Sequence, residues 1–152
     1  MPLTARPDVL EFFDRYRRGA DTSDQEVLRD CFAETFLHLD PRSCAPVPRE
    51  GLIRGLNGRA QRFGSIGVEA LELTELSETP LDDLHTLVAT TWTARFSPGA
   101  DDAEPLVLPS QFLLRRSVES WQIVVYLNST DLAAVFAERT DAPPISGPAG
   151  GR

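Results

Sequence analysis

Hydrophobic side chains recur at helical spacing in three segments within the first 64 residues. In residues 7–19, PDVLEFFDRYRRG, the apolar positions fall three or four apart, after a proline at the start and before a glycine at the end. Residues 23–32 begin with a serine and a glutamate at capping-box spacing, and residues 49–64 carry a third apolar face that ends at a glycine. The pattern predicts three amphipathic helices.

A short strand is predicted between the second and third helices. The stretch FLHLDPRS, Phe36 to Ser43, alternates apolar and polar side chains and is interrupted at Asp40-Pro41. The segment SCAPVP, residues 43–48, is rich in proline and predicts a loop.

From residue 66 onward the hydrophobic period changes from helical spacing to alternation, which indicates strands. The predicted strands span residues 68–76, 84–96, 106–116 and 121–127. Changes of parity within the first strand indicate bulges that bend it, and the last two strands are joined across the turn SVES. Strands in this order predict an antiparallel meander, and residues 129–139 predict a short closing helix.

These elements predict an α+β fold, in which a cone-shaped, curved antiparallel sheet packs on three N-terminal helices and a short C-terminal helix. A curved sheet covered by helices encloses a cavity. With 152 residues, the chain is expected to form a single domain over residues 5–139. Residues 140–152 are rich in proline and glycine and are expected to be a disordered tail.

Composition narrows the possible partners. The formal net charge of -8, from 23 acidic and 15 basic residues, disfavours nucleic acid and anionic membrane surfaces. The chain has no apolar run of the ~18 to 20 residues that a membrane span needs, and no signal-peptide pattern at its N-terminus, so a cytoplasmic location is expected. Cys31 and Cys44 lack the spacing of a metal or redox motif and are expected to be reduced thiols, with no metal site.

The chain resembles the nuclear transport factor 2-like superfamily, which includes SnoaL-like polyketide cyclases and ketosteroid isomerase. The resemblance covers about residues 7–138. It rests on the order of elements, on the Asp-Pro after the first strand and on the ending FLLRRSVESWQIVVYLNSTDL. It implies a hydrophobic pocket at one end of the cone and a homodimer formed through the outer sheet face. The superfamily hosts enzymes and non-catalytic modules alike.

The resemblance also implies catalytic candidates. Asp40 matches the position of the proton-transferring base in ketosteroid isomerase-like members, and Tyr16 matches the phenol that stabilises the enolate oxygen. His38 shares the parity of Asp40 and is an alternative base. A structural role competes for each: an Asp before Pro commonly ends a strand, and this is the stronger interpretation of Asp40, while a helix-face Tyr is usually a core residue.

Further candidates are expected to line the pocket. They are Phe36, Trp92, Phe96, Gln111, Phe112, Tyr126 and Asn128. The family pattern places a protonated acid where this chain has LPSQFLLRR, so Gln111 is the nearest polar candidate there, and the sequence leaves open which way Gln111, Tyr126 and Asn128 face. The arginines of the third helix are interpreted as a solvated face rather than an anion site. They are Arg49, Arg54, Arg59 and Arg62.

The sequence therefore favours a pocket protein that acts on a small hydrophobic molecule by proton transfer without a cofactor, as an isomerase, cyclase or dehydratase. The alternative is a non-catalytic module that binds a ligand or only dimerises. An open pocket with converging ionisable groups favours the first, and a pocket filled by aromatic side chains favours the second.

Overall fold

The computed structural model of this chain describes residues 3–100 and 103–141. Its helices are α1 (Pro7–Thr22), α2 (Gln25–Cys31), α3 (Arg49–Ser65) and α4 (Leu132–Asp141). Helix α1 starts with a proline, whose missing N–H would be unpaired there in any case, and Ser23 ends it with a left-handed backbone (φ 53°). The cap of α2 is Asp24, which accepts a hydrogen bond from the Val27 N–H at 3.3 Å, so the predicted capping by Ser23 is wrong.

A curved sheet forms the other layer. Its strands are β1 (Leu3–Thr4), β2 (Phe32–Asp40), β3 (Ser43–Pro48), β4 (Val68–Pro80), β5 (His85–Phe96), β6 (Val107–Arg116) and β7 (Trp121–Asn128). They lie in the order β1-β4-β5-β6-β7-β2-β3. The predicted antiparallel meander runs from β4 to β7, whereas β1 pairs with β4 and β2 pairs with β7 in parallel.

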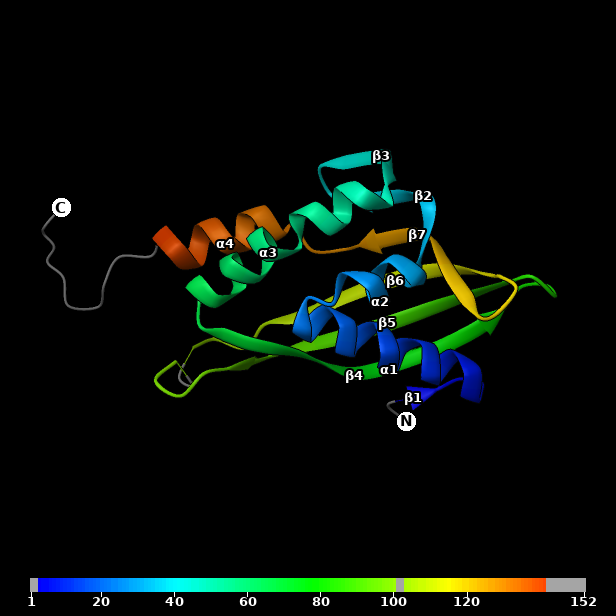
Figure 1. Cartoon of the computed structure of the whole chain (residues 1–152). Helices are drawn as coiled ribbons and strands as arrows, with labels where there is room; N and C mark the ends of the chain where they lie inside the picture. Colours follow the sequence, from blue (N-terminus) through cyan, green and yellow to red (C-terminus); the bar gives the residue numbers. More distant parts are fainter. Residues whose placement is uncertain (1–2, 101–102, 142–152) are drawn as a thin grey trace, which may run out of the picture.

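The predicted α+β fold, a curved sheet covered by helices, is confirmed (Figure 1). Strand β4 shifts register between Val68 and Ala70 and between Leu73 and Glu75, as the parity changes in the sequence indicated. Helices α1, α2 and α3 lie over the concave face of the sheet, and α4 packs beside α3, where the rings of Phe63 and Phe136 meet at 4.9 Å.

The segment predicted as a loop, residues 43–48, is strand β3, paired with β2 at the edge of the sheet. An edge strand tolerates proline because one side of its backbone needs no partner in the ladder. The carboxylate of Asp40 organises the turn between the two strands, since Oδ1 accepts the N–H groups of Arg42 and Ser43, each at 2.8 Å.

The core lies between the helices and the concave sheet face. Its largest fully buried side chains include Phe13, Phe32, Phe112 and Trp121. Tail residues 142–152 lie outside the described residues, so the expected disorder is not described. In the described part of the chain, no helix is both long and apolar enough to cross a membrane.

Candidate functional site

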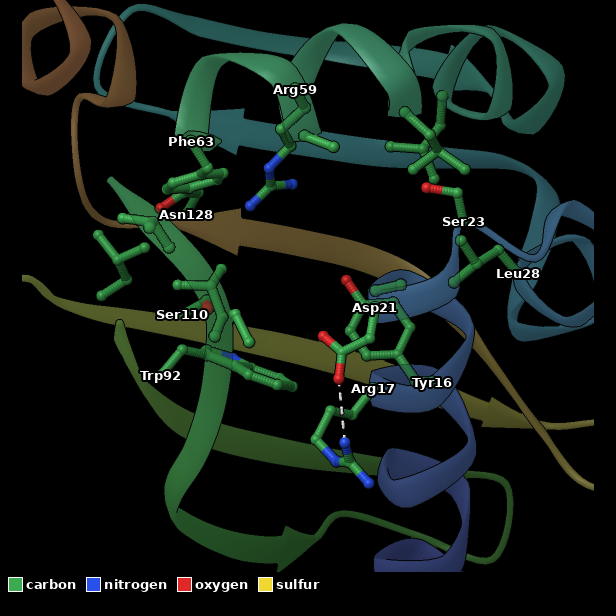
Figure 2. A pocket seen from close by; sticks show the side chains of 18 of the residues that line it. Tyr16, Arg17, Asp21, Ser23, Leu28, Arg59, Phe63, Trp92, Ser110 and Asn128 are labelled. Carbon is green, nitrogen blue, oxygen red and sulfur yellow. Dashed lines mark hydrogen bonds and ion pairs between the residues drawn. The ribbon is translucent and has the colours of Figure 1, made fainter. Parts of the chain in front are cut away.

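A cavity of about 180 Å³ lies between α1, α3 and the concave face of the sheet (Figure 2). Apolar side chains from helices and strands line it: Leu28, Phe32, Leu52, Leu56, Phe63, Val68, Leu71, Trp92 and Leu108. A cavity of about 150 Å³ is enough to hold one benzene ring. The space therefore fits a molecule of one or two rings, with walls suited to an apolar body.

Tyr16 enters the cavity from α1. Its ring packs edge-on against those of Phe32, Trp92 and Phe112, with centroids about 6 Å apart (6.0, 6.0 and 5.7 Å). Burial raises the pKa of the Tyr16 phenol, and the neighbouring Tyr126 adds to this effect. The hydroxyl of Tyr16 is therefore a neutral hydrogen-bond donor at physiological pH.

Tyr126 reaches the same cavity from β7. Its ring stacks on Phe112 with centroids 4.9 Å apart and planes within 8°, and His38 packs edge-on against it at 5.4 Å. This packing holds the ring from both sides, so the position of the hydroxyl is fixed by the sheet.

Arg59 is the charged group of α3 that points into this space (Figure 2). Its guanidinium carbon lies 5.6 Å from the centre of the Phe63 ring. Proximity of Tyr126 raises the pKa of Arg59 and outweighs the opposing effect of burial, with a smaller contribution from Tyr16. The solvated face predicted for the arginines of this helix holds for Arg54 and Arg62, which are exposed, and is wrong for Arg59. It is also wrong for Arg49, which is half-buried and donates to the carbonyls of Arg29 and Phe32, each at 3.1 Å.

Two polar side chains lie on the floor of the cavity, Ser110 on β6 and Asn128 on β7. Both are buried, at 5 % and 7 % exposure. Beside them, the indole N–H of Trp92 donates to Thr90 Oγ1 at 2.9 Å, and Thr90 Oγ1 donates to the Ser110 carbonyl at 3.0 Å. Because its polar atom is satisfied, Trp92 is held as a fixed wall.

The acidic residues that line the cavity are paired with arginines. Asp21 Oδ2 lies 3.0 Å from Arg17 Nη1, and Glu69 Oε2 lies 3.2 Å from Arg95 Nη2. Figure 2 shows the first pair on α1, beside Tyr16 and across from Arg59. Asp21 is therefore the carboxylate of α1 that reaches the cavity.

The sequence-derived candidates divide into two groups. Tyr16, Trp92, Tyr126 and Asn128 line the cavity. Phe112 lies behind the two tyrosines, Phe36 packs on Phe32 at 4.7 Å, and Phe96 packs under Arg139 at 6.0 Å. Gln111 is exposed, since it alternates with the buried Ser110 and Phe112 along β6.

The structure does not bring Asp40 or His38 to the lining of the cavity. The hydrogen bond from the Arg42 N–H, with others from Ser43, lowers the pKa of the Asp40 carboxyl. His38 Nδ1 lies 4.0 Å from Asp40 Oδ2, so the two side chains are neighbours at the end of β2. Neither side chain is therefore placed to contact a ligand in the cavity.

Sequence reasoning missed Arg59 and Asp21 as lining residues. The signal for Arg59 was its spacing, because it follows Leu56 by three positions and precedes Phe63 by four, on the apolar face of the helix. No such signal exists for Asp21, because the residues around it at the C-terminal end of α1 are mostly polar and do not indicate which side chains face the cavity.

Comparisons with known proteins give a likeness of structure. No protein-family model matches the chain, and no curated protein matches it. Aln2 from a Streptomyces species is similar, with a TM-score of 0.66 and 17% identity over 88% of this chain and 98% of that one. An NTF-2 like protein of unknown function from Shewanella oneidensis has a TM-score of 0.64 and 11% identity over 81% and 97%.

A third similar structure is an NTF2-like protein with a cystatin-like fold from Novosphingobium aromaticivorans. It has a TM-score of 0.63 and 17% identity, over 85% of this chain and 86% of that one. At these identities the likeness concerns the fold. The chain has the nuclear transport factor 2-like fold, with a pocket between its helices and its curved sheet.

Proposed function

We propose that the protein binds a small, mainly apolar molecule in this cavity and catalyses proton transfer on it without a cofactor, as an isomerase, cyclase or dehydratase. The observation that carries the proposal is the convergence of Tyr16, Tyr126 and Arg59, from three different elements, on one apolar cavity. Polar groups placed in this way fix the orientation of a ligand whose body is held by the apolar walls.

The two phenols suit the stabilisation of a developing oxyanion. Tyr16 stays neutral because burial raises its pKa, so it can donate a hydrogen bond to an enolate oxygen. Tyr126 is held in place by its stacking on Phe112. Preorganised donors in an apolar site stabilise such charge more strongly than water does.

The base in this proposal is Asp21, in place of Asp40 and His38. Its carboxylate lies on the same helix as Tyr16 and lines the same cavity. The ion pair with Arg17 holds it at 3.0 Å and fixes its orientation. Abstraction of a proton from a carbon next to a carbonyl would then leave the carbonyl oxygen facing the phenols.

Deuterium exchange tests this function without knowledge of the natural substrate. With 2-tetralone in D₂O, followed by proton NMR, the protein is expected to accelerate exchange of the protons beside the carbonyl. Asp21→Asn and Tyr16→Phe should each slow the catalysed exchange about 100-fold, because they remove the base and an oxyanion donor. Glu11→Gln, at an exposed position of the same helix, is the matched control and should exchange like the wild type.

Exchange no faster with the protein than in buffer would reject catalysis of this type. The non-catalytic alternative has one observation in its favour, since both acidic lining residues are already ion-paired. It is supported if 2-tetralone quenches tryptophan fluorescence in a saturable way while the exchange rate stays at the buffer value.

The proposal includes a homodimer formed through the outer sheet face. Apolar side chains that are exposed or half-buried are neighbours there on β5, β6 and β7: Leu87, Ala89, Leu113 and Val125. Contiguous apolar surface of this kind marks association sites.

Light scattering after gel filtration should therefore give a dimer mass at micromolar concentration. Ala89→Arg is expected to weaken association at least about tenfold, because it places a charge in the contact. Ala137→Arg adds the same charge at an exposed position of α4 and should leave the mass unchanged. A wild-type protein of monomer mass would contradict the proposal.

A further inference from the structure

We infer that the ligand of this cavity is a small monoanion, a carboxylate on one or two rings, whose charge is matched by Arg59; the inference rests on the proposed role of the cavity as a ligand site. It follows from three observations: the ion pairs of the lining residues, the environment of the guanidinium and the size of the space.

The acidic residues that line the cavity form their ion pairs with arginines other than Arg59. Arg17 lies in contact with both Asp14 and Asp21, and Arg95, outside the lining, with both Glu69 and Glu72. Within residues 3–100 and 103–141, Arg59 makes no ion pair with a carboxylate. A negatively charged group on a ligand in the cavity would therefore give Arg59 an ionic partner.

The environment of Arg59 favours the binding of a negatively charged ligand. The guanidinium points into a cavity walled by leucine and aromatic side chains, where an unpaired charge is costly. Contact with the Phe63 ring at 5.6 Å offsets only part of this cost, and neutral phenols carry no opposite charge. A carboxylate matches the planar fork of a guanidinium with two parallel hydrogen bonds.

The size of the space limits the rest of the molecule. About 180 Å³ accommodates one ring or a fused pair, and Trp92, Phe32 and Phe63 offer flat walls against it. A four-ring body is too large to be enclosed. The body of the ligand is therefore a small aromatic or alicyclic ring system.

The test compares two probes of the same shape and different charge. 2-Naphthoate and 2-naphthamide are titrated into the full chain at pH 7, with tryptophan fluorescence and calorimetry as readouts. The wild type is expected to bind the carboxylate at least about tenfold more tightly than the amide, since a charge-assisted bidentate pair replaces a neutral hydrogen bond. In Arg59→Met this preference should disappear, and in Arg59→Lys part of it should remain.

Arg62→Met is the matched control, because it removes the same charge from an exposed position of the same helix. It should keep the preference of the wild type. An equal loss in Arg62→Met would show that long-range charge, not a local pair, sets the preference, and would overturn the inference. Circular dichroism of each variant reports folding, and if Arg59→Met does not fold, the comparison of Arg59→Lys with the wild type decides.

The outcomes separate this inference from the proposed function. If the amide binds as tightly as the carboxylate, the monoanion is rejected while a small-molecule ligand stands. If neither probe binds at millimolar concentration and 2-tetralone is neither bound nor exchanged, the inference and the proposed function both fail.

Discussion

Replacing Phe112 by alanine is expected to lower the free energy of unfolding by about 3–5 kcal/mol. Phe112 is fully buried (0 % exposed) at the centre of the sheet. Its ring contacts those of Phe13 at 5.1 Å, Tyr16 at 5.7 Å and Tyr126 at 4.9 Å. The substitution removes these contacts and leaves a cavity that backbone strands cannot collapse to fill.

Urea denaturation followed by circular dichroism measures this loss. Phe112→Leu keeps most of the apolar volume and should cost clearly less than the alanine variant. Gln111→Ala, the exposed neighbour on the same strand, should change stability by less than about 0.5 kcal/mol. Similar losses for the alanine variants at positions 111 and 112 would mean that the strand is not anchored by the Phe112 side chain.

Phe112→Ala is also expected to weaken ligand binding in the cavity. Phe112 does not line the cavity, yet it packs against both of the phenols that do. A residue predicted as a ligand contact thus supports the ligand contacts from behind. Binding of either naphthalene probe to Phe112→Ala should accordingly be weaker than to Gln111→Ala.

The fold was accessible to sequence reasoning because its signals are local and repeated. Alternation over β5, β6 and β7 and parity changes in β4 specified a bent meander, since a pleated strand buried on one face requires them. Strand β3 was missed because prolines at a sheet edge look like those of a loop, and only the pairing with β2 distinguishes the two.

The candidate site was less accessible because it depends on the direction of single side chains. For Asp40 the sequence left a catalytic role and a turn role open and favoured the turn, where its carboxylate accepts hydrogen bonds from Arg42 and Ser43. Arg59 has the spacing of a residue on the apolar face of its helix. Because arginine side chains are mostly exposed, an orientation toward solvent was the more reasonable expectation. What brings Asp21 across from Arg59 is the packing of α1 and α3 over the sheet, which no local pattern encodes.

Glu78 is expected to make the protein sensitive to acid. Its side chain is 3 % exposed, and its carboxylate accepts hydrogen bonds from the Arg6 N–H at 2.9 Å, from Arg6 Nε at 3.0 Å and from the Thr86 hydroxyl at 2.6 Å. Burial alone would raise the pKa of Glu78, but the hydrogen bonds from Arg6 and Thr86 outweigh it and lower the pKa. The stabilisation is therefore fully present above the pKa of an unfolded glutamate, about 4.3, and is lost as the pH falls through the lower folded value.

Glu78→Gln isolates this contribution because it keeps the shape and removes the charge. At pH 7 the variant should be less stable than the wild type by about 2 kcal/mol, since it replaces charge-assisted hydrogen bonds to a buried group with neutral ones. The difference should shrink toward zero as the wild-type carboxylate becomes protonated, which urea denaturation between pH 7 and pH 3 measures. Other acids with a lowered pKa, such as Asp82 and Asp131, are present in both proteins, so their contributions cancel in the difference.

Glu75→Gln, at an exposed position of the same strand, is the control and should differ little in stability from the wild type at any pH. A loss of stability in Glu78→Gln that does not change with pH would point to packing rather than charge.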